Sequence, residues 1–329
     1  MQKYDYNVRT IDTEGEEFMK KKTIAGWIIS LVLIGLMAQT AELSGIRELI
    51  FPEMAALLTG SFLMKQRPWN VKHGMYTLIM SLSAFAGILI SRYAGTPLYF
   101  KVLLATAAVF AILFLSRMTM LPAISACVLP VLIGSTAWIY VASVAIIAGI
   151  CDLGNAVMEQ TGLMMKKEYE PVKRNAAHWA VMLMVFAVVL LLPMGTGFHY
   201  MVAPPLIVAF VTLSGTTVRE VHPPVQTILL FTGTALAGYF CRILSDGTVL
   251  PETFWIVAAA ACAWTLFTLT GRFFPPASAL AVLPFLLPEE GLWQYPFEVL
   301  AGIALLYLAA CVADALEKKG NLNKWKASV

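Results

Sequence analysis

The sequence predicts an all-α polytopic membrane protein of about twelve transmembrane or half-spanning helices, arranged as two parallel six-helix repeats. Three observations support this fold class: an apolar composition, apolar segments that alternate with short polar loops, and a repeated proline motif. The motif Pro122-Ala123 followed by Val128-Leu129-Pro130 returns as Pro276-Ala277 followed by Val282-Leu283-Pro284. Tandem repetition with prolines inside apolar segments is typical of transporters and channels.

The composition excludes a soluble protein. Of the 329 residues, 59% are hydrophobic and only 13% are charged, whereas an average globular domain has about 25% charged residues. The polar stretches are too short for an external domain, and the net charge of +3 is spread over many helix ends. We therefore expect the lipid bilayer as the main partner and no nucleic acid.

Twelve apolar segments follow one another, six in each half of the chain. They cover residues 23–43, 49–64, 74–91, 102–116, 118–133 and 136–157, and then 177–193, 199–218, 225–241, 253–271, 274–287 and 295–316. Spanning the hydrocarbon takes about 20 residues, so the short or proline-interrupted second and fifth segments of each half predict broken or re-entrant helices. Because each group of three helices carries a proline motif on its middle helix, each half is interpreted as a 3+3 inverted repeat.

Lysine and arginine set the orientation, because they gather in cytoplasmic loops. With the N-terminus inside, 19 of the 23 basic residues fall on the inner side, and only Arg47, Arg92, Lys101 and Arg242 fall outside. The chain then divides into a cytoplasmic tail (1–22), a first repeat (23–158), a basic cytoplasmic linker (159–176), a second repeat (177–316) and a basic cytoplasmic tail (317–329). This predicts a multi-pass protein of the cell (inner) membrane with both termini cytoplasmic.

The prolines that open the short segments define the expected substrate pathway. Proline fits the first turn of a helix, and a helix N-terminus inside the membrane offers free N–H groups to an anion. Small residues follow and leave room for a small ligand. Alternatively, the prolines only kink the helices, the small residues only pack them, and the Glu53 carboxylate only caps its helix. The predicted pathway residues are Pro52, Glu53, Pro122, Ser125, Pro204, Pro205, Pro275, Pro276 and Ser278.

Two arginines and two aspartates near the apolar segments are further candidates, because charged groups in a bilayer tend to face a pathway or a partner. Arg117 and Arg272 stand just before the paired proline motifs and either steer anions towards the helix N-termini or act as positive-inside anchors. Asp152 and Asp314 lie near the inner ends of the sixth helix of each half. There they either pair with basic residues or bind a proton.

No residue pattern supports catalysis, so we expect no enzyme, no cofactor and no metal site. The four histidines are scattered over separate loops and helix ends, and no metal, nucleotide or hydrolase motif occurs. The cysteines are expected to be small buried hydrophobic residues, because they fall inside apolar segments without ligand spacing. They are Cys127, Cys151, Cys241, Cys262 and Cys311.

The run Pro275-Pro276-Ala277-Ser278-Ala279-Leu280 resembles the signature of the HPP family of integral membrane proteins. Phe51-Pro52, then Pro68-Trp69-Asn70-Val71 and Gly74 resemble the earlier segment of that family, and Pro122-Ala123 resembles the later one. Phe274 stands where the family has histidine, and the glycine of the motif is missing. Because some plastid and cyanobacterial members are associated with nitrite transport, the resemblance implies a small-anion transporter.

The expected function is therefore membrane transport, by a carrier or a channel, of a small solute, with a nitrite-like anion favoured by the resemblance. An organic or aromatic acid is an alternative substrate, because tryptophans could line a wider route, although interfacial anchoring explains most of them. A non-transporting membrane scaffold or assembly subunit is the alternative from another class, and a homo-oligomer fits either. A polar cavity would favour transport, and a packed interior would favour the scaffold. The tryptophans concerned are Trp27, Trp69, Trp138, Trp179, Trp255, Trp264 and Trp293.

Overall fold

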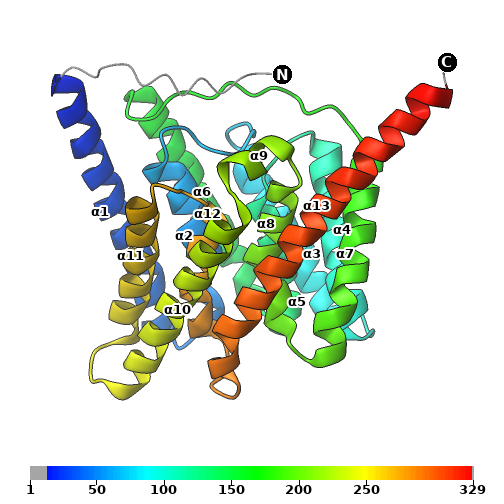
Figure 1. The fold of residues 1–329 in the computed structure, drawn as a ribbon. Coiled ribbons are helices and arrows are strands. Elements are labelled where there is room, and N and C mark those ends of the chain that lie inside the picture. Colours follow the sequence, from blue (N-terminus) through cyan, green and yellow to red (C-terminus); the bar gives the residue numbers. More distant parts are fainter. Residues whose placement is uncertain (1–12, 328–329) are drawn as a thin grey trace.

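The computed structural model describes residues 13–327, and the regular elements in this range are all helical (Figure 1). Within these residues, eight helices are long and apolar enough to cross a membrane. The predicted all-helical class is thus confirmed, and the long helices are compatible with a multi-pass membrane protein. They are α1 (Thr13–Ser44), α3 (Met75–Tyr93), α4 (Leu98–Ser116), α6 (Ile139–Gln160), α7 (Ala176–Thr196), α10 (Pro224–Gly247), α11 (Glu252–Thr270) and α13 (Tyr295–Ala327).

Shorter apolar elements lie between the long helices and correspond to the second and fifth apolar segments of each half. A helix rises about 1.5 Å per residue, so these elements are too short to cross about 30 Å of hydrocarbon. They are α2 (Glu53–Leu58) with the π-helical turn η2 (Thr59–Leu63), α5 (Pro122–Leu132), α8 (Pro204–Leu213), and α12 (Pro275–Val282) with the 3-10 turn η4 (Leu283–Leu286). The connections contain η1 (Arg47–Leu49), η3 (His199–Val202), α9 (Thr216–Val221) and η5 (Leu292–Gln294).

The segment 199–218 is interrupted, in agreement with the broken second segment that the sequence predicts, because non-helical backbone at Ala203 and at Gly215 separates η3, α8 and α9. The boundaries of the predicted tails differ from the prediction, because helices α1 and α13 continue into the ranges 1–22 and 317–329. Residues 1–12 and 328–329 of those tails lie outside the described residues.

The segment between α6 and α7 crosses one end of the bundle, at the top of Figure 1, and that end is here called the linker face. Met165 N donates to Lys65 O at 3.1 Å, and Val172 N donates to Arg117 O at 3.1 Å. The end of η2 and the start of α5 therefore both lie at the linker face. It follows that α2–η2 runs towards this face and α5 runs away from it.

Close packing between long and short helices depends on glycine. A Cβ atom on Gly87 of α3 would lie 2.2 Å from Cys127 O of α5, and one on Gly238 of α10 would lie 2.3 Å from Ala281 O of α12. Any larger residue would have to push the two backbones apart. Helix α3 also packs on α4 and α6, helix α10 packs on α11 and α13, and the halves meet where α1 contacts α11 and α4 contacts α7.

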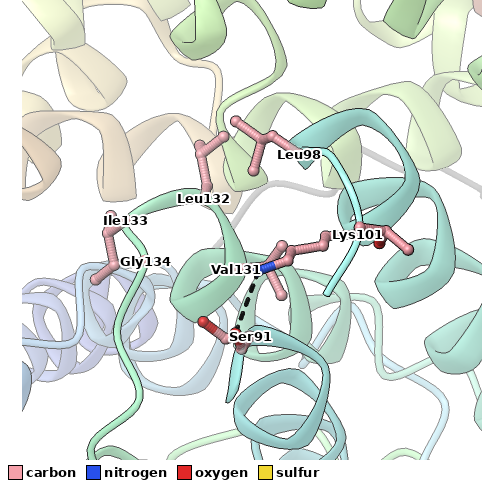
Figure 2. Close-up of a pocket in the computed structure, with 8 residues that line it drawn as sticks. Ser91, Leu98, Lys101, Val131, Leu132, Ile133 and Gly134 are labelled. Carbon is pink, nitrogen blue, oxygen red and sulfur yellow. Dashed lines mark hydrogen bonds between the residues drawn. The ribbon is translucent and has the colours of Figure 1, made fainter. Parts of the chain in front are cut away.

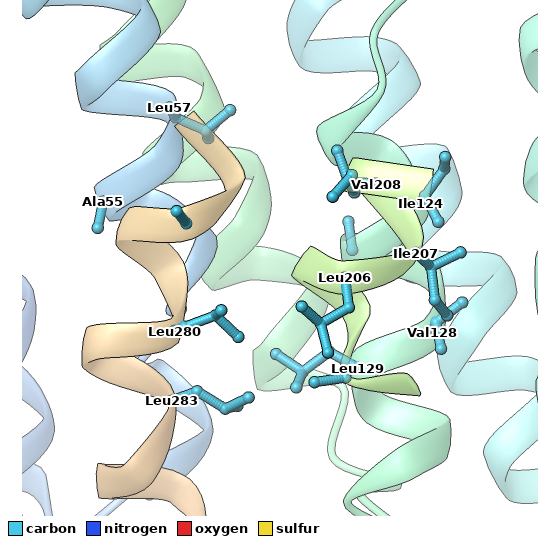
Figure 3. Close-up of a cluster of buried hydrophobic side chains, with 14 of the residues drawn as sticks. Ala55, Leu57, Ile124, Val128, Leu129, Leu206, Ile207, Val208, Leu280 and Leu283 are labelled. Carbon is cyan, nitrogen blue, oxygen red and sulfur yellow. The ribbon is translucent and has the colours of Figure 1, made fainter. Parts of the chain in front are cut away.

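The short helices meet one another inside the bundle. Helix α2 contacts α12 and α5, and α8 contacts α5 and α12. Each of these four elements contacts two of the others, and we call the four together the short-helix ring. Figure 3 shows that apolar side chains from all four fill the space between them, among them Leu57, Ile124, Leu129, Leu206 and Leu280, which are buried. Close packing of this kind is the main attraction between helices in lipid, where apolar burial by itself gives little.

Candidate substrate pathway

The short helices begin at the prolines that the sequence singles out. Helices α5, α8 and α12 start at Pro122, Pro204 and Pro275, and α2 starts directly after Pro52. Proline fixes a helix-compatible φ and lacks the N–H that a first turn leaves unpaired. Helical backbone is disfavoured for a residue that precedes proline. Ala203 and Phe274, which precede the first prolines of α8 and α12, accordingly lie outside the helical region.

Every residue of the predicted pathway is buried, and all of them lie on or directly beside the short-helix ring. The contacts between α2, α12, α8 and α5 bring together segments that are far apart in the sequence. The residues are Pro52, Glu53, Pro122, Ser125, Pro204, Pro205, Pro275, Pro276 and Ser278.

Glu53 carries a carboxyl group into this interior. The residue is 1% exposed, and neither carboxylate oxygen has a hydrogen-bond partner among the described residues. The Ser125 hydroxyl on α5 is its polar neighbour and is close enough to interact with the carboxyl group, but the two groups form no well-aligned hydrogen bond. Tyr140 and Tyr295 lie near Glu53, but their hydroxyls donate to backbone carbonyls instead. Tyr140 Oη donates to Ala126 O at 3.0 Å, and Tyr295 Oη donates to Leu280 O at 2.7 Å. The fold thus leaves this carboxyl group without a fixed partner.

A second polar group lies nearer the linker face, where η2, α11 and α12 meet. Trp264 Nε1 donates to Thr59 Oγ1 at 2.9 Å, and Thr59 Oγ1 lies 3.1 Å from Ser278 Oγ. Each hydroxyl also lies within donating distance of a carbonyl of its own helix. One hydroxyl proton cannot serve two acceptors fully, so the bond between Thr59 and Ser278 competes with the bonds to the helix carbonyls. A polar ligand has two adjustable hydroxyls here.

The sequence-based prediction included Ser278 but missed Thr59 and Trp264. It also missed the buried hydrogen bond from Asn155 Nδ2 to Ser61 Oγ, 3.1 Å long, on the linker-face side of Thr59. A signal was present, because hydroxyl residues recur within the apolar segment that follows Pro52. The contact of Thr59 with Trp264 joins residues 205 positions apart, and no local pattern predicts that pairing.

Arg117 and Arg272 lie at the ends of α4 and α11 but engage different loops. Arg117 is the C-cap of α4 in a left-handed conformation with φ 58°, and its carbonyl accepts from Val172 N. The guanidinium of Arg272 donates to Val221 O. The Arg117 side chain is exposed, whereas that of Arg272 is partly buried. No contact joins the two, so the structure does not bring the predicted steering residues together at one point.

Asp152 is held in a polar network near the linker-face end of α6. Its Oδ1 lies 2.8 Å from His73 Nδ1, and its Oδ2 accepts from Gly74 N at 2.6 Å. His73 Nε2 lies 3.3 Å from Glu159 Oε2, and Glu159 Oε1 lies 2.9 Å from Arg67 Nε. Arg67 and Glu159 are both nearly inaccessible to solvent, at 3% and 6%. This network fastens the start of α3 to the end of α6.

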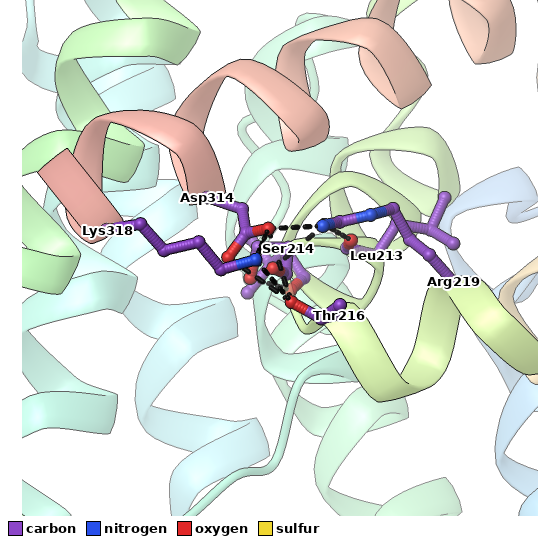
Figure 4. Close-up of polar contacts among 7 residues, drawn as sticks. Leu213, Ser214, Thr216, Arg219, Asp314 and Lys318 are labelled. Carbon is purple, nitrogen blue, oxygen red and sulfur yellow. Dashed lines mark hydrogen bonds and ion pairs between the residues drawn. The ribbon is translucent and has the colours of Figure 1, made fainter.

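Asp314 occupies a similar network on α13 (Figure 4). Arg219 Nη2 of α9 donates to Asp314 Oδ2 at 2.5 Å, and Lys318 Nζ donates to the same atom at 2.7 Å. Thr216 Oγ1 donates to Asp314 at 3.2 Å. Both candidate aspartates are thus paired with basic or histidine side chains, the arrangement expected of a structural role.

Lys167 and His222, which lie outside the spanning helices, have a lowered pKa. Burial, and then the Arg67 charge, lower the pKa of the Lys167 ammonium in the linker, where Lys167 Nζ donates to Pro68 O at 3.0 Å. Burial, and then the Arg272 charge, lower the pKa of His222 to about 4. The neutral His222 ring stacks on Phe274 with centroids 4.5 Å apart. Phe274, the residue before Pro275, therefore packs on a histidine.

A surface groove of about 340 Å³ lies at the end of the bundle opposite the linker face (Figure 2). It is lined by the ends of α3 and α5 and the start of α4, and Lys101 Nζ donates to Ser91 O at 3.4 Å beside it. The proline-led helix starts do not line it. Within the part of the chain that the structure describes, no cluster of three or more His, Cys, Asp or Glu fits a metal ion.

Comparisons with known proteins found no matching family model, no matching curated protein and no matching solved structure. The class of the protein therefore rests on its own fold. It is an all-helical protein with eight helices of spanning length in the described range, and these helices accompany a buried ring of short, proline-initiated helices.

Proposed function

We propose that this protein is a membrane transporter for a small solute, and that the solute is an anion. The observation that carries the proposal is the short-helix ring, in which four proline-initiated helices end within the bundle. Transporters commonly bind substrates between discontinuous helices of this kind, because helix ends supply polar groups that lipid cannot satisfy. The N–H groups at helix starts favour anions in particular.

The proposal includes a two-repeat architecture in which residues 23–158 and 177–316 have the same fold. Its support is that long and short helices follow one another in the same order in α1–α6 and in α7, α8 and α10–α13. The tyrosine contacts are also equivalent. Tyr140 Oη donates to Ala126 O, the fifth residue of α5, and Tyr295 Oη donates to Leu280 O, close to the same position of α12.

Further contacts recur at matching places. Gly87 touches the carbonyl of the residue five positions after Pro122, and Gly238 touches the carbonyl five positions after Pro276. The ion pair of Arg67 with Glu159 likewise corresponds to the pair of Arg219 with Asp314. Each of these contacts joins two elements in the first half of the chain and recurs between the corresponding two elements in the second half. Two copies of one unit therefore explain the contacts more simply than coincidence.

The two directions of the short helices support the inverted plan proposed within each half. Helix α2 runs towards the linker face and α5 runs away from it, so their N-terminal ends point to opposite sides. An anion that approaches from either side would then meet a positive helix end. Alternating exposure of such a site by rocking of one unit against another is the usual mechanism of transporters with internal repeats.

The resemblance to the HPP family makes nitrite the first substrate to test. We also propose that the linker face is cytoplasmic, because the basic residues of the linker lie there, and that the protein resides in the cell (inner) membrane. Arg117 and Arg272 lie at this face and would raise the local anion concentration, an effect that salt screens.

Flux measurement in proteoliposomes tests the proposal. Purified protein should increase the flux of nitrite or another small anion above that of protein-free vesicles. Ser125→Leu and Ser278→Leu place a larger side chain in the ring and should abolish this increase. Thr265→Leu is the matched control, because Thr265 lies on the exposed face of α11. If no anion of a broad panel crosses faster with the wild-type protein, the proposal is refuted.

The packed apolar interior of the ring supports a second candidate, a non-transporting scaffold or assembly subunit. In a transporter this packing corresponds to a closed state that must open during the cycle. A scaffold would need no opening, so it should show no flux. In a scaffold, Ser125→Leu should change only the packing of the ring. The same flux assay therefore separates the two functions.

A further inference from the structure

Among the buried acids of the described residues, the Glu53 carboxyl group is the one that has neither a counter-ion nor a well-formed hydrogen bond. Glu159 and Asp314 each have an arginine within 3 Å, and Glu298 accepts a hydrogen bond from Tyr200 N at 2.7 Å. Glu53 is buried as deeply as any of them, and neither of its oxygens has a partner in the described part of the chain. An ionised carboxylate in such a place would be costly, whereas a protonated one is tolerated.

The helices around Glu53 supply no compensating charge. Helix α5 contributes the Ser125 hydroxyl and Cys127, α6 contributes Tyr140, and the start of α13 contributes Tyr295. Helix α12 and η2 contain no titratable side chain. In the described side chains of α1, the charged group is Glu42, which is exposed and bonded to Thr253. A proton is therefore the counter-ion that this site can accept.

We propose that Glu53 is the proton-binding site of a proton-coupled anion transporter, an inference that rests on the proposed transport function. One proton binds a carboxylate oxygen and forms the neutral acid, and an anion then occupies the ring without repulsion from Glu53. Release of the anion and the proton on the other side restores the carboxylate. For a monovalent anion the cycle moves one positive and one negative charge together, so it is electroneutral.

Polar groups on the same segment lead from Glu53 towards the linker face. The Thr59 hydroxyl follows on the next turns and contacts Ser278, and Ser61 follows with its bond from Asn155. Both hydroxyls belong to the π-helical turn η2, and π-helical turns are frequent at functional sites. A proton would therefore reach Glu53 from the linker face along these hydroxyls. The apolar side chains of the short-helix ring would block access from the opposite face.

Proton uptake that accompanies anion entry into proteoliposomes tests the inference. A pH dye in the lumen should report acidification when nitrate is added outside, since nitric acid is too strong to carry protons across the bilayer by itself. Glu53→Gln should abolish the acidification and the pH dependence of flux while retaining anion exchange. Glu53→Asp should retain part of the coupling, and Glu290→Gln, in an exposed loop, should behave as wild type. Nitrite is measured in parallel against its leak in protein-free vesicles.

Infrared difference spectroscopy gives a second readout that needs no transport. The carbonyl band of a protonated carboxylic acid should be present at neutral pH in the wild-type protein and in Glu290→Gln, and absent in Glu53→Gln. Absence of the band from the wild type, or proton uptake by Glu53→Gln equal to that of the wild type, overturns the inference. If the band is present but no anion is transported, the proposed function fails and the proton site stands.

Discussion

Replacement of Gly238 by alanine should destabilise the protein, although alanine is the better helix former. The added Cβ would lie 2.3 Å from Ala281 O and 2.7 Å from Ala281 C and Cα. Ordinary contact begins at 3.4 Å, and backbone atoms cannot rotate away. Helices α10 and α12 must then separate by about 1 Å, and overpacking of this kind costs about 1–3 kcal/mol.

Gly233 of the same helix provides the matched control. Its Cβ would meet only Leu266 Cδ1, at 3.5 Å, which is ordinary contact. Replacement of glycine by alanine in a helix gains up to about 1 kcal/mol, so Gly233→Ala should be neutral or stabilising. After the same gain is subtracted, Gly238→Ala should lose up to about 2 kcal/mol.

Unfolding of both variants in detergent, by temperature and by denaturing detergent, measures the difference. We expect Gly238→Ala to unfold first, with Gly233→Ala at or above the wild type. Gly87→Ala should behave like Gly238→Ala, because its Cβ would lie 2.2 Å from Cys127 O. Equal stability of Gly238→Ala and Gly233→Ala would show that the close approach of α10 and α12 is wrong.

Three further predictions concern charged groups. Arg67→Ala should cost up to about 3–5 kcal/mol, because it leaves the nearly inaccessible Glu159 carboxylate with only the 3.3 Å contact to His73, and a double change of Arg67 and Glu159 to Ala should recover part of the loss in the same unfolding assay. His222 takes up a proton at about pH 4 in the folded protein but near 6.5 when unfolded, so acidification through this window should destabilise the wild type more than His222→Gln; equal pH profiles would contradict this. Changing both Arg117 and Arg272 to Gln should lower anion flux more at low than at high ionic strength, and an unchanged flux at low salt would leave them as topological anchors.

The sequence predicted the order of long and short helices because the signals are local. Spanning helices require long apolar runs, and prolines such as Pro122 and Pro204 mark a helix start by their own geometry. For the same reason the burial of the predicted pathway residues followed from the segments that contain them. The sequence also predicted a break in the segment 199–218, but it did not place the second break at Gly215, where the extended backbone has no strong local signal.

The partners of individual polar side chains were not predictable in this way. Trp264 reaches Thr59, and Arg67 reaches Glu159, across large separations in the sequence. Such pairs depend on how the helices pack. Arg117 and Arg272 look equivalent in the sequence, yet the left-handed C-cap of α4 is Arg117, while that of α11 is Gly271. The residue that ends α11 as Arg117 ends α4 is therefore Gly271, one residue before Arg272.

Trans-stimulated exchange tests the central claim, transport of a small anion through the short-helix ring, most directly. Proteoliposomes loaded with unlabelled nitrite should take up isotopically labelled nitrite faster than unloaded ones, with saturation, and Ser278→Leu should remove the effect while Thr265→Leu retains it. Uptake equal to that of protein-free vesicles, for nitrite and for every other small anion tested, would contradict the account.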